Sequence, residues 1–486
     1  MKAELVSKAY EVAKERYAAI GIDTEKVLQQ LQDFHLSMHC WQADDVKGFE
    51  VQAGAMSGGI QSTGDFPGAA RNIDELRQDV LKAKSLIPGS HRLNLHEIYG
   101  DFKGKVVDRD EVTVEYFQSW IDWAKDNNTL LDFNSSSFSH PKSGSLSLSN
   151  PDEGIRKFWI EHTKRCRDIA NAMGEAQGDP CIMNLWVHDG CKDVSVNHGL
   201  YRNLLKASLD EIFEKEQPMM KDCIEGKVFG IGLESFTVGS HDFYTAYAAK
   251  NNMMLTIDTG HYHPTEVPGD KVSAVLQFVP ELMLHVSRPI RWDSDHVTIM
   301  DDMTQDLFSE IVRAGALDRV HYGLDYFDAS INRIGAYVVG SRAAQKCMLR
   351  ALLEPIAQLR EYEANGQGFE RLALLEDGSG ATEYSYGRMG EVTKQRRTLV
   401  IPNVAVATYT TEWSYDSHNR LQEMIYPDGE KIKYFYNLGG QLSSIVGEKE
   451  YLYRYIDSTG YDAYEQKVYQ RMGNGAVTTY DYSKER

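Results

Sequence analysis

Eight short apolar runs recur along the first two thirds of this chain, and each is followed by a stretch long enough for a helix. The runs lie at residues 36–40, 93–95, 130–133, 182–186, 223–225, 253–258, 282–286 and 320–325. Continuous apolar runs of this length are typical of strands buried on both faces, and strands that alternate with helices build parallel sheets. Eight such units predict an α/β fold, a closed (β/α)8 barrel of the TIM type. This periodicity leaves a doubly wound open sheet as the alternative.

Polar side chains stand where these runs end. All strands of a parallel barrel end at the same rim, so residues distant in sequence meet there and form the site of chemistry. The polar residues at or just after the predicted strand ends are His39, Trp41, His96, Asn134, Asp189, Glu225, Lys227, Asp258, His261, His285 and Asp325.

Composition excludes several classes of function. The 486 residues carry a formal net charge of −19, which disfavours a nucleic-acid partner because such partners need a basic surface. The sequence has no apolar run of about 18 residues and begins with a charged amphipathic pattern, so we expect neither membrane insertion nor export. The six cysteines lack CxxC spacing and are interpreted as reduced thiols of a cytoplasmic protein. The expected ligand is a small molecule.

The amino-acid composition changes near residue 376. Residues from Asp377 onward contain 15 of the 27 tyrosines, one of the 15 histidines and none of the six cysteines. Aromatic segments such as Tyr384-Ser385-Tyr386 and Tyr434-Phe435-Tyr436 recur there about every 20 to 30 residues with turn signals between them, which predicts repeated β-hairpins. We therefore predict two domains, a barrel over 1–376 and a β-hairpin-rich C-terminal tail over 377–486. The tail resembles YD (Rhs-type) repeats.

Seven potential metal ligands lie in the second half of the predicted barrel. They are Glu225, Asp258, His261, His285, Asp293, Asp295 and Asp325. Oxygen ligands suit Mg²⁺ or Mn²⁺ and imidazole favours transition metals, so the set fits a site for two divalent cations. Taken singly, each residue has an ordinary explanation as a helix cap or a hydrogen-bonded core residue.

Local spacing supports the metal interpretation. Asp258 and His261 flank a turn with a glycine, so both side chains can reach one side of a strand end. Asp293 and Asp295 have the spacing that aims two side chains the same way in extended backbone. So many carboxylates in one pocket are costly without cations. The alternative is an ion-pair network with Arg288 and Arg291.

Long segments of the chain resemble the L-rhamnose isomerase family, almost continuously from the N-terminus to about residue 375. The segments that carry the resemblance are 37–42 (SMHCWQ), 58–61 (GGIQ), 92–96 (RLNLH), 131–134 (LDFN), 225–227 (EGK), 258–266 (DTGHYHPTE), 285–296 (HVSRPIRWDSDH) and 323–333 (GLDYFDASINR). The resemblance implies a (β/α)8 barrel, usually a homotetramer, that interconverts L-rhamnose and L-rhamnulose in L-rhamnose catabolism. It also implies two divalent cations per subunit, commonly Mn²⁺, with Zn²⁺ or Co²⁺ as alternatives at the structural site.

The resemblance also implies roles for individual residues. The structural cation would be held by Glu225, Asp258, His285 and Asp325, and the catalytic cation by His261, Asp293 and Asp295. Lys227 would lie beside the substrate oxygens, His96 near the ring oxygen and Trp186 on the apolar face of the sugar.

Aldose–ketose isomerisation moves hydrogen from C2 to C1 of the sugar. With two cations on adjacent sugar oxygens, we expect a direct 1,2-hydride shift, with Asp325 as a candidate to take the O2 proton. We also expect Lys227, with its pKa lowered by the cations, to donate a hydrogen bond to O1; its ordinary alternative is a salt bridge to Glu225. Two other functions remain open: isomerisation of a related aldose, and a structural or adhesive YD-repeat protein with an inactive barrel.

Overall fold

The computed structural model describes residues 3–41, 47–51, 68–227, 235–290, 293–364, 372–377, 379–401 and 405–483. The chain divides into two compact units, Met1–Glu354 and Pro355–Arg486, which are described separately below. The domain boundary at residue 376 was placed where the amino-acid composition changes, and it stays a prediction.

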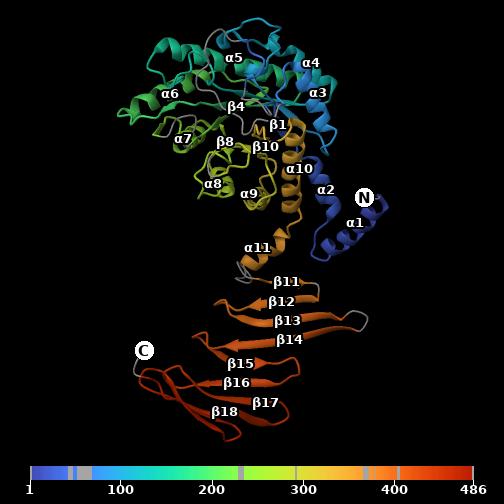
Figure 1. The fold of residues 1–486 in the computed structure, drawn as a ribbon, viewed down its shortest axis with the longest axis vertical. Coiled ribbons are helices and arrows are strands. Elements are labelled where there is room, and N and C mark those ends of the chain that lie inside the picture. Colours follow the sequence, from blue (N-terminus) through green and yellow to red (C-terminus); the bar gives the residue numbers. More distant parts are fainter. Residues whose placement is uncertain are drawn as a thin grey trace. The chain divides into compact units, whose positions relative to one another are not determined.

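The first unit contains the predicted closed barrel. Its eight strands are all parallel and are joined in the order β1-β10-β9-β8-β6-β4-β3-β2, with β1 bonded to both β10 and β2. Figure 1 labels β1, β4, β8 and β10 among them. The barrel strands are β1 (Leu36–His39), β2 (Arg92–His96), β3 (Leu131–Ser135), β4 (Cys181–Trp186), β6 (Met220–Glu225), β8 (Met254–Asp258), β9 (Leu282–Val286) and β10 (Val320–Leu324). All eight strands predicted from apolar runs are confirmed, and the open-sheet alternative is excluded.

Helices precede and connect the strands, and most of them cover the outside of the barrel. They are α1 (Ala3–Ala18), α2 (Thr24–Gln32), α3 (Ile73–Lys84), α4 (Gln118–Asp126), α5 (Glu153–Gln177), α6 (His198–Ile212), α7 (His241–Asn251), α8 (Gly269–Val275), α9 (Asp302–Arg313) and α10 (Arg333–Leu352). Short 3-10 helices lie at η1 (Glu97–Tyr99), η2 (Arg109–Glu111) and η3 (Val114–Phe117), and β5 (Gly190–Cys191) pairs with β7 (Phe236–Thr237). None of the described helices is both long enough and apolar enough to cross a membrane.

Local sequence explains where the helices begin and end. The longest helix, α5, begins after Asp152, whose side chain accepts a hydrogen bond from the amide of Ile155, and it ends at Gly178, which adopts a left-handed φ of 67°. Gly174 in the same helix is required by packing, because a Cβ there would lie 1.7 Å from the carbonyl oxygen of Met219. The helix can therefore approach the segment that enters β6 closely.

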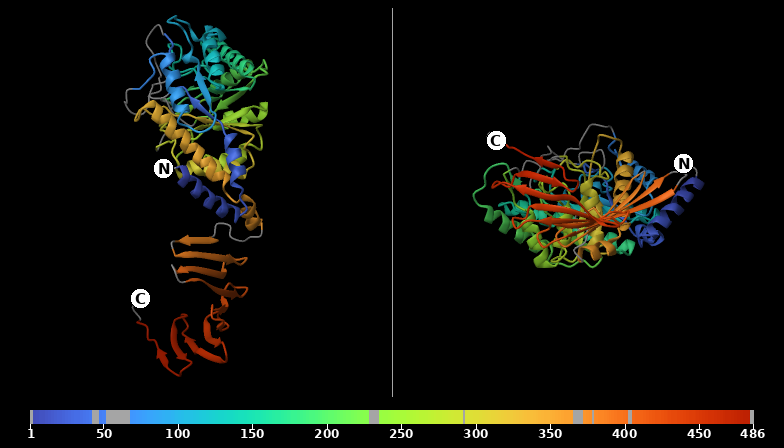
Figure 2. Two further views of the ribbon diagram at one scale, coloured as in Figure 1. Left: turned by 90° about the vertical axis from the view of Figure 1, so that its right-hand side faces the viewer. Right: turned by 90° about the horizontal axis from the view of Figure 1, so that it is seen from below.

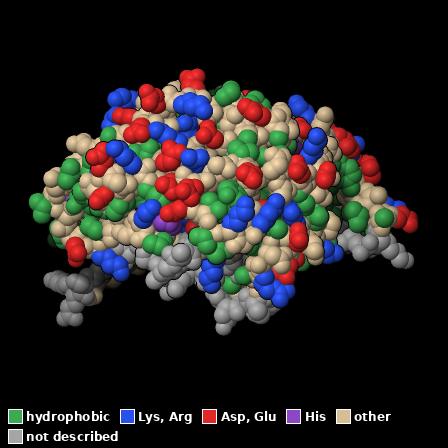
Figure 3. Space-filling view, turned by 90° about the horizontal axis from the view of Figure 1, so that it is seen from above, with side chains coloured by type: hydrophobic (Ala, Val, Ile, Leu, Met, Phe, Trp, Pro, Cys, Tyr) green, Lys and Arg blue, Asp and Glu red, His purple; other side chains and the backbone are tan. Residues whose placement is uncertain are grey.

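The register of the barrel places the predicted polar strand ends side by side. His96 pairs with Asn134, Trp186 with Glu225, and Asp258 with His285. The positions before these ends are apolar and buried, among them Leu95, Ile224, Ile257 and Leu284. The apolar part of each strand therefore forms the core, and the last residues present polar groups at one rim. Over the face of the molecule seen in Figure 3, acidic and basic side chains are interspersed.

The second unit contains α11 (Ile356–Ala364) and a ten-stranded antiparallel sheet. Its strands follow chain order and form a single twisted layer (Figure 2). They are β11 (Leu374–Asp377), β12 (Gly380–Tyr386), β13 (Val392–Ile401), β14 (Ala405–Tyr415), β15 (Leu421–Ile425), β16 (Lys431–Tyr436), β17 (Leu442–Glu448), β18 (Leu452–Tyr461), β19 (Lys467–Met472) and β20 (Val477–Thr479). The predicted β-hairpin-rich tail is confirmed as a fold, whereas its relation to YD repeats stays a prediction.

Two repeated hydrogen-bonding patterns stabilise this sheet. In each of six turns, the fourth residue has a positive φ, and its amide donates a hydrogen bond to the carbonyl three residues earlier at 2.9 to 3.2 Å. These fourth residues are Gly390, Asn419, Gly429, Gly440, Glu465 and Gly475. In addition, a tyrosine at the open end of each hairpin donates its hydroxyl to a backbone carbonyl at or near the start of the preceding strand, at 2.7 to 3.1 Å; these residues are Tyr386, Tyr415, Tyr436, Tyr461 and Tyr482. These bonds account for five of the 15 tyrosines that follow residue 376.

Candidate metal centre

Four of the seven predicted ligands gather at the C-terminal ends of adjacent strands. Glu225, Asp258, His285 and Asp325 each offer one ligand atom within 4.8 Å of the others. Nδ1 of His285 lies 3.2 Å from Oε2 of Glu225 and 3.1 Å from Oδ2 of Asp325. Three carboxylates and one imidazole at this separation can surround one divalent cation.

Three predicted ligands form a second group that shares Asp258 with the first. Ligand atoms of Asp258, His261 and Asp293 also lie within 4.8 Å of one another, and Nε2 of His261 is 3.3 Å from Oδ2 of Asp293. The turn at Gly260 permits this approach, because a Cβ there would lie 2.6 Å from Oδ1 of Asp293. The prediction that Asp258 and His261 reach one side of a strand end is confirmed. The shared Asp258 makes it a candidate to contact both cations.

Asp295 differs from the sequence-based expectation. It adopts a left-handed φ of 45°, so the argument that extended backbone aims Asp293 and Asp295 the same way is wrong. Asp295 also belongs to none of the groups of potential ligands, which include a third one of His39, His285 and Asp325. Burial nevertheless raises the pKa of Asp295 well above its ordinary value, and the charges of Asp293 and Asp325 raise it further.

The donor atoms of the cluster fit cations. Several of them are buried and have no hydrogen-bond partner among the described residues: Oδ2 of Asp258, both ring nitrogens of His285, Oδ1 of Asp293 and Oδ1 of Asp325. Buried polar atoms are normally paired, so a group of orphaned oxygens and nitrogens that converge on one place indicates an ion-binding site. The alternative network with arginines is not supported in the described part, where Arg288 makes no ion pair with the cluster; Arg291 lies outside the described residues.

Buried charges divide the carboxyl groups of the cluster into two kinds. Burial raises the pKa of Asp258 to about 8, partly offset by His261. Burial also opposes the ionisation of Glu225, but His285 and His261 outweigh it and hold the pKa of Glu225 well below its ordinary value. Like charges that crowd one pocket push neighbouring pKa values apart, and divalent cations would relieve that repulsion.

Lys227 and Trp186 lie together at the second ligand group. Nζ of Lys227 is 2.8 Å from Oδ2 of Asp293, 3.3 Å from Nε2 of His261 and 4.8 Å from the centre of the Trp186 ring. Burial lowers the pKa of Lys227, but the charge of Asp293 outweighs burial and raises it. The lowered pKa was expected from bound cations, so it stays a prediction. The salt bridge that the sequence assigned to Glu225 is made with Asp293.

An aromatic row lines the rim beside the ligand groups and includes His96. The ring centroids of Trp41 and His96 are 4.8 Å apart, those of His96 and Phe138 5.7 Å, and those of Phe138 and Trp186 5.3 Å. Sequence analysis named Trp186 and His96 as substrate contacts and placed Trp41 at a strand end, but it missed Phe138. The serine-rich segment around Phe138 carries no periodic signal that would have identified it.

Three further polar residues support the ligands. Nδ2 of Asn184 donates to Oε2 of Glu225 at 2.5 Å, and Thr256 donates to the amide oxygen of Asn184 at 2.7 Å, which fixes the orientation of that carboxylate. His39 is buried and its Nε2 lies 3.7 Å from Oδ1 of Asp325, and burial lowers the pKa of His39 to about 3. A neutral imidazole there can approach the ligand group without adding charge. Gln42 and segment 58–61 lie outside the described residues.

A closed (β/α)8 barrel with two overlapping groups of carboxylates and imidazoles at the strand C-termini defines a candidate metal-dependent barrel enzyme. The family of L-rhamnose isomerase (RhaA) matches residues 4–405, and the chain belongs to that family.

Sequence comparison finds relatives of high identity. The chain is 77% identical over 376 residues to the L-rhamnose isomerase of Bacteroides thetaiotaomicron, an alignment that covers 77% of this chain and 90% of that protein. It is 55% identical over 375 residues to the L-rhamnose isomerase of Rhodopirellula baltica, with 76% and 88% covered. It is 54% identical over 375 residues to that of Shigella flexneri serotype 5b, with 76% and 89% covered.

Proposed function

We propose that this chain is an L-rhamnose isomerase, a metal-dependent aldose–ketose isomerase that interconverts L-rhamnose and L-rhamnulose in L-rhamnose catabolism. The observation that carries the proposal is the pair of overlapping ligand groups at the barrel rim, in a chain 77% identical to a protein of that name. An enzyme of this class binds a small sugar. The inactive-barrel alternative is not favoured, because the predicted ligands converge.

The ligand groups and the resemblance to the family together support two cation sites, and the place of Asp295 in the second rests on the resemblance. Glu225, Asp258, His285 and Asp325 would hold a structural cation, and His261, Asp293 and Asp295 would hold a catalytic one. The metal we propose is Mn²⁺, because carboxylate-rich sites with one imidazole suit it, with Zn²⁺ or Co²⁺ as alternatives at the structural site. When bound, the cations polarise the sugar oxygens and favour loss of a hydroxyl proton.

The remaining chemistry falls to side chains of the barrel rim. Trp186 presents an apolar ring to the sugar, and the protonated ammonium of Lys227 beside it donates a hydrogen bond to O1. The carboxylate of Asp325 takes the proton from O2, hydrogen moves with its electron pair from C2 to C1, and a proton reaches O1. Lys227 holds its proton through Asp293, so it stabilises negative charge that develops on O1.

Isotope transfer tests the hydride shift. L-rhamnose that carries deuterium at C2 should give L-rhamnulose that retains the label at C1, because the hydrogen never exchanges with water. Complete loss of the label to solvent would instead require an enediol intermediate and a general base.

Direct assay tests the function. The purified protein with Mn²⁺ should convert L-rhamnose, with a larger kcat/KM than for neighbouring aldoses that differ at one carbon. Asp295→Asn should abolish turnover and leave the fold largely intact by circular dichroism. Preference for another aldose would favour the related-isomerase alternative, and full activity of Asp295→Asn would overturn the assignment of the catalytic cation.

We also propose a cytoplasmic homotetramer. The resemblance to the family supports both properties, and the lack of a membrane-spanning helix among the described residues agrees with the location. Light scattering coupled to size exclusion should give about four times the 55.0 kDa chain mass. A monomer mass would overturn the assembly.

A further inference from the structure

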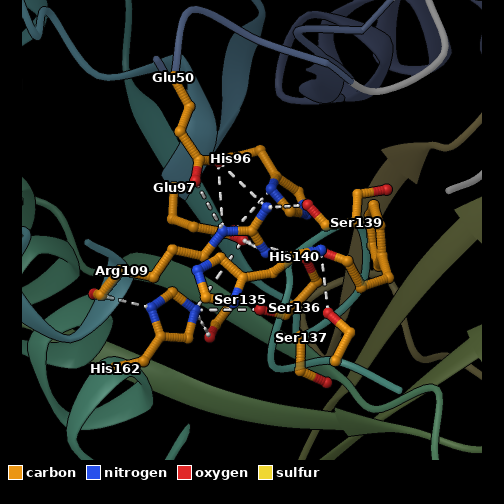
Figure 4. Close-up of polar contacts among 12 residues, drawn as sticks. Glu50, His96, Glu97, Arg109, Ser135, Ser136, Ser137, Ser139, His140 and His162 are labelled. Atoms are coloured by element: carbon orange, nitrogen blue, oxygen red, sulfur yellow. Dashed lines mark hydrogen bonds and ion pairs between the residues drawn. The ribbon is translucent and has the colours of Figure 1, made fainter. Parts of the chain in front are cut away.

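Glu97 is a buried carboxylate directly behind His96, at the first residue of η1. Its side chain is 0% exposed, and Oε2 lies 2.5 Å from Nδ1 of His96 (Figure 4). The other oxygen, Oε1, accepts a hydrogen bond from Oγ of Ser136 at 3.1 Å and lies 3.5 Å from Nη1 of Arg109. Nothing in the metal centre or in the proposed reaction uses this carboxylate.

Arg109 is immobilised around Glu97 and also holds the neighbouring aromatic residue. Arg109 is 2% exposed, and its guanidinium donates to both oxygens of Glu50 at 3.1 to 3.3 Å. It also donates to the carbonyl oxygen of Phe138 at 2.7 Å and to that of Ser139 at 3.2 Å. One arginine thus fixes the carboxylate behind His96 and the segment that places Phe138 against the His96 ring. Such interlocked donors and acceptors leave little freedom to reorient.

The carboxyl group of Glu97 is held in its ionised form. Burial raises the pKa of this carboxyl group, but His96 and then Arg109 outweigh burial and lower its pKa to about 2. A carboxylate close to one ring nitrogen of an imidazole orients the ring and fixes its tautomer. The proton on Nδ1 then faces Glu97, and Nε2, on the other edge of the ring, is the atom left for chemistry.

An aldose sugar in water is mostly a closed ring, yet isomerisation needs a free carbonyl at C1. Opening the ring requires that the O1 hydroxyl loses its proton and that the ring oxygen O5 gains one. Nε2 of a correctly oriented histidine near the ring oxygen can accept the first proton and deliver the second.

We propose that Glu97 is a positioning residue that orients His96 for ring opening, with Arg109 holding Glu97 in place. The inference rests on the proposed isomerase function. In the step, the O1 proton moves to Nε2, the C1–O5 bond breaks with its electron pair on O5, a C1=O1 double bond forms, and the proton passes from Nε2 to O5. No oxidant or reductant takes part.

Glu97→Gln tests the proposal, because the amide keeps the shape and removes the charge. We expect kcat/KM for L-rhamnose to fall about 100-fold, within the range of general acid–base contributions. The kinetic isotope effect of C2 deuterium should fall toward 1, since ring opening then limits the rate. A fall in rate with an undiminished isotope effect would place the damage in hydrogen transfer and overturn the proposal, as would an unchanged rate.

A matched control exists at the opposite ends of the strands. Oε2 of Glu281 lies 2.5 Å from Nε2 of His321 and 2.6 Å from Nζ of Lys221. This group also combines a carboxylate, a histidine and a cationic side chain, but it lies far from the rim. Glu281→Gln should leave kcat/KM within about twofold of wild type, the range of surface substitutions. An equal loss in both variants would indicate a general effect on stability and overturn the role of Glu97.

A double variant separates positioning from structure. In a His96→Gln background, Glu97→Gln should change kcat/KM by less than about twofold, because its effect acts through His96. A further large loss in that background would overturn the proposal. If Glu97→Gln does not fold, Ser136→Ala removes one donor to the same carboxylate and should cost about 3- to 10-fold, again only when His96 is present. Wild-type protein without isomerase activity would defeat the proposed function, whereas an active wild type with an unaffected Glu97→Gln would defeat this inference alone.

Discussion

The buried ion pair between Lys227 and Asp293 allows a quantitative test of the site. The two side chains are 5% and 11% exposed, and Nζ and Oδ2 are 2.8 Å apart. Unit charges at that distance attract by about 6 kcal/mol at an effective dielectric constant of about 20, most of which offsets the cost of burying them. Asp293→Asn leaves the ammonium buried beside a neutral amide. We expect the free energy of unfolding of the barrel to fall by about 3 kcal/mol in metal-free buffer.

The pKa of Lys227 fixes the pH dependence of this loss. Burial lowers the pKa, but Asp293 outweighs burial and raises it above the ordinary value of 10.5. A group whose pKa is raised on folding stabilises the fold fully below the unfolded pKa, and the stabilisation is lost as pH rises through the folded pKa. The contribution of the Lys227–Asp293 pair to the difference between wild type and Asp293→Asn should therefore shrink above about pH 10.5. A second change is expected near pH 8, because burial and, to a smaller extent, Asp293 raise the pKa of Asp258 to about 8.

Urea unfolding in EDTA, followed by tryptophan emission, measures the effect. The signal reports mainly on the barrel, because six of the seven tryptophans precede residue 377. Asp193→Asn, an exposed aspartate, is the control for loss of one negative charge. Equal unfolding free energies for wild type and Asp293→Asn, or the same loss in the control, would refute the electrostatic reasoning.

Metal binding should stabilise the fold: Mn²⁺ at about 100 times its Kd should add about 2.7 kcal/mol to the unfolding free energy relative to EDTA, and Asp325→Asn should reduce this gain in the same titration. Gly174→Ala should cost about 2 kcal/mol or more in urea unfolding, because its Cβ would meet the Met219 carbonyl, whereas Gly199→Ala in α6 has open space and should stabilise by about 0.5–1 kcal/mol. The reverse order would contradict the packing argument. Tyr436→Phe removes the hydroxyl that donates to Leu421 and should speed hydrogen exchange in β15 and β16 about fivefold with isomerase activity unchanged; unaltered exchange would show that the bond is negligible.

Strand existence was predictable because buried parallel strands are continuously apolar. The predicted strand was too short where polar residues interrupt the apolar run. β6 begins at Met220, three residues before the predicted start. Its first part contains Lys221 and Asp222, which pair with Glu281 and Arg167. Convergence of Glu225, Asp258 and His285 followed from the rule that strands of a parallel barrel end at one rim. No tertiary contact was needed for that step.

The rest of the site depends on contacts that sequence pattern does not encode. The backbone at Asp295 is left-handed, so period-2 reasoning misplaced its side chain. The pKa of Lys227 depends on burial and on Asp293, which lies 66 residues further along the chain, and local sequence indicates neither. Glu97 lies in η1, Arg109 in η2 and Glu50 in the segment 47–51, and each alone is an ordinary surface-type charge. Only the fold shows that all three charges meet behind His96.

The hairpins of the C-terminal sheet are linked in series, each closed at its open end by one tyrosine hydroxyl, and among the described side chains of the sheet only Thr382 and Ile432 are buried. Because the hairpins share no buried core, the sheet is not expected to unfold as one cooperative unit. Under a pulling force it should unzip one hairpin after another in small, even steps, whereas the closed barrel should rupture in a single large event.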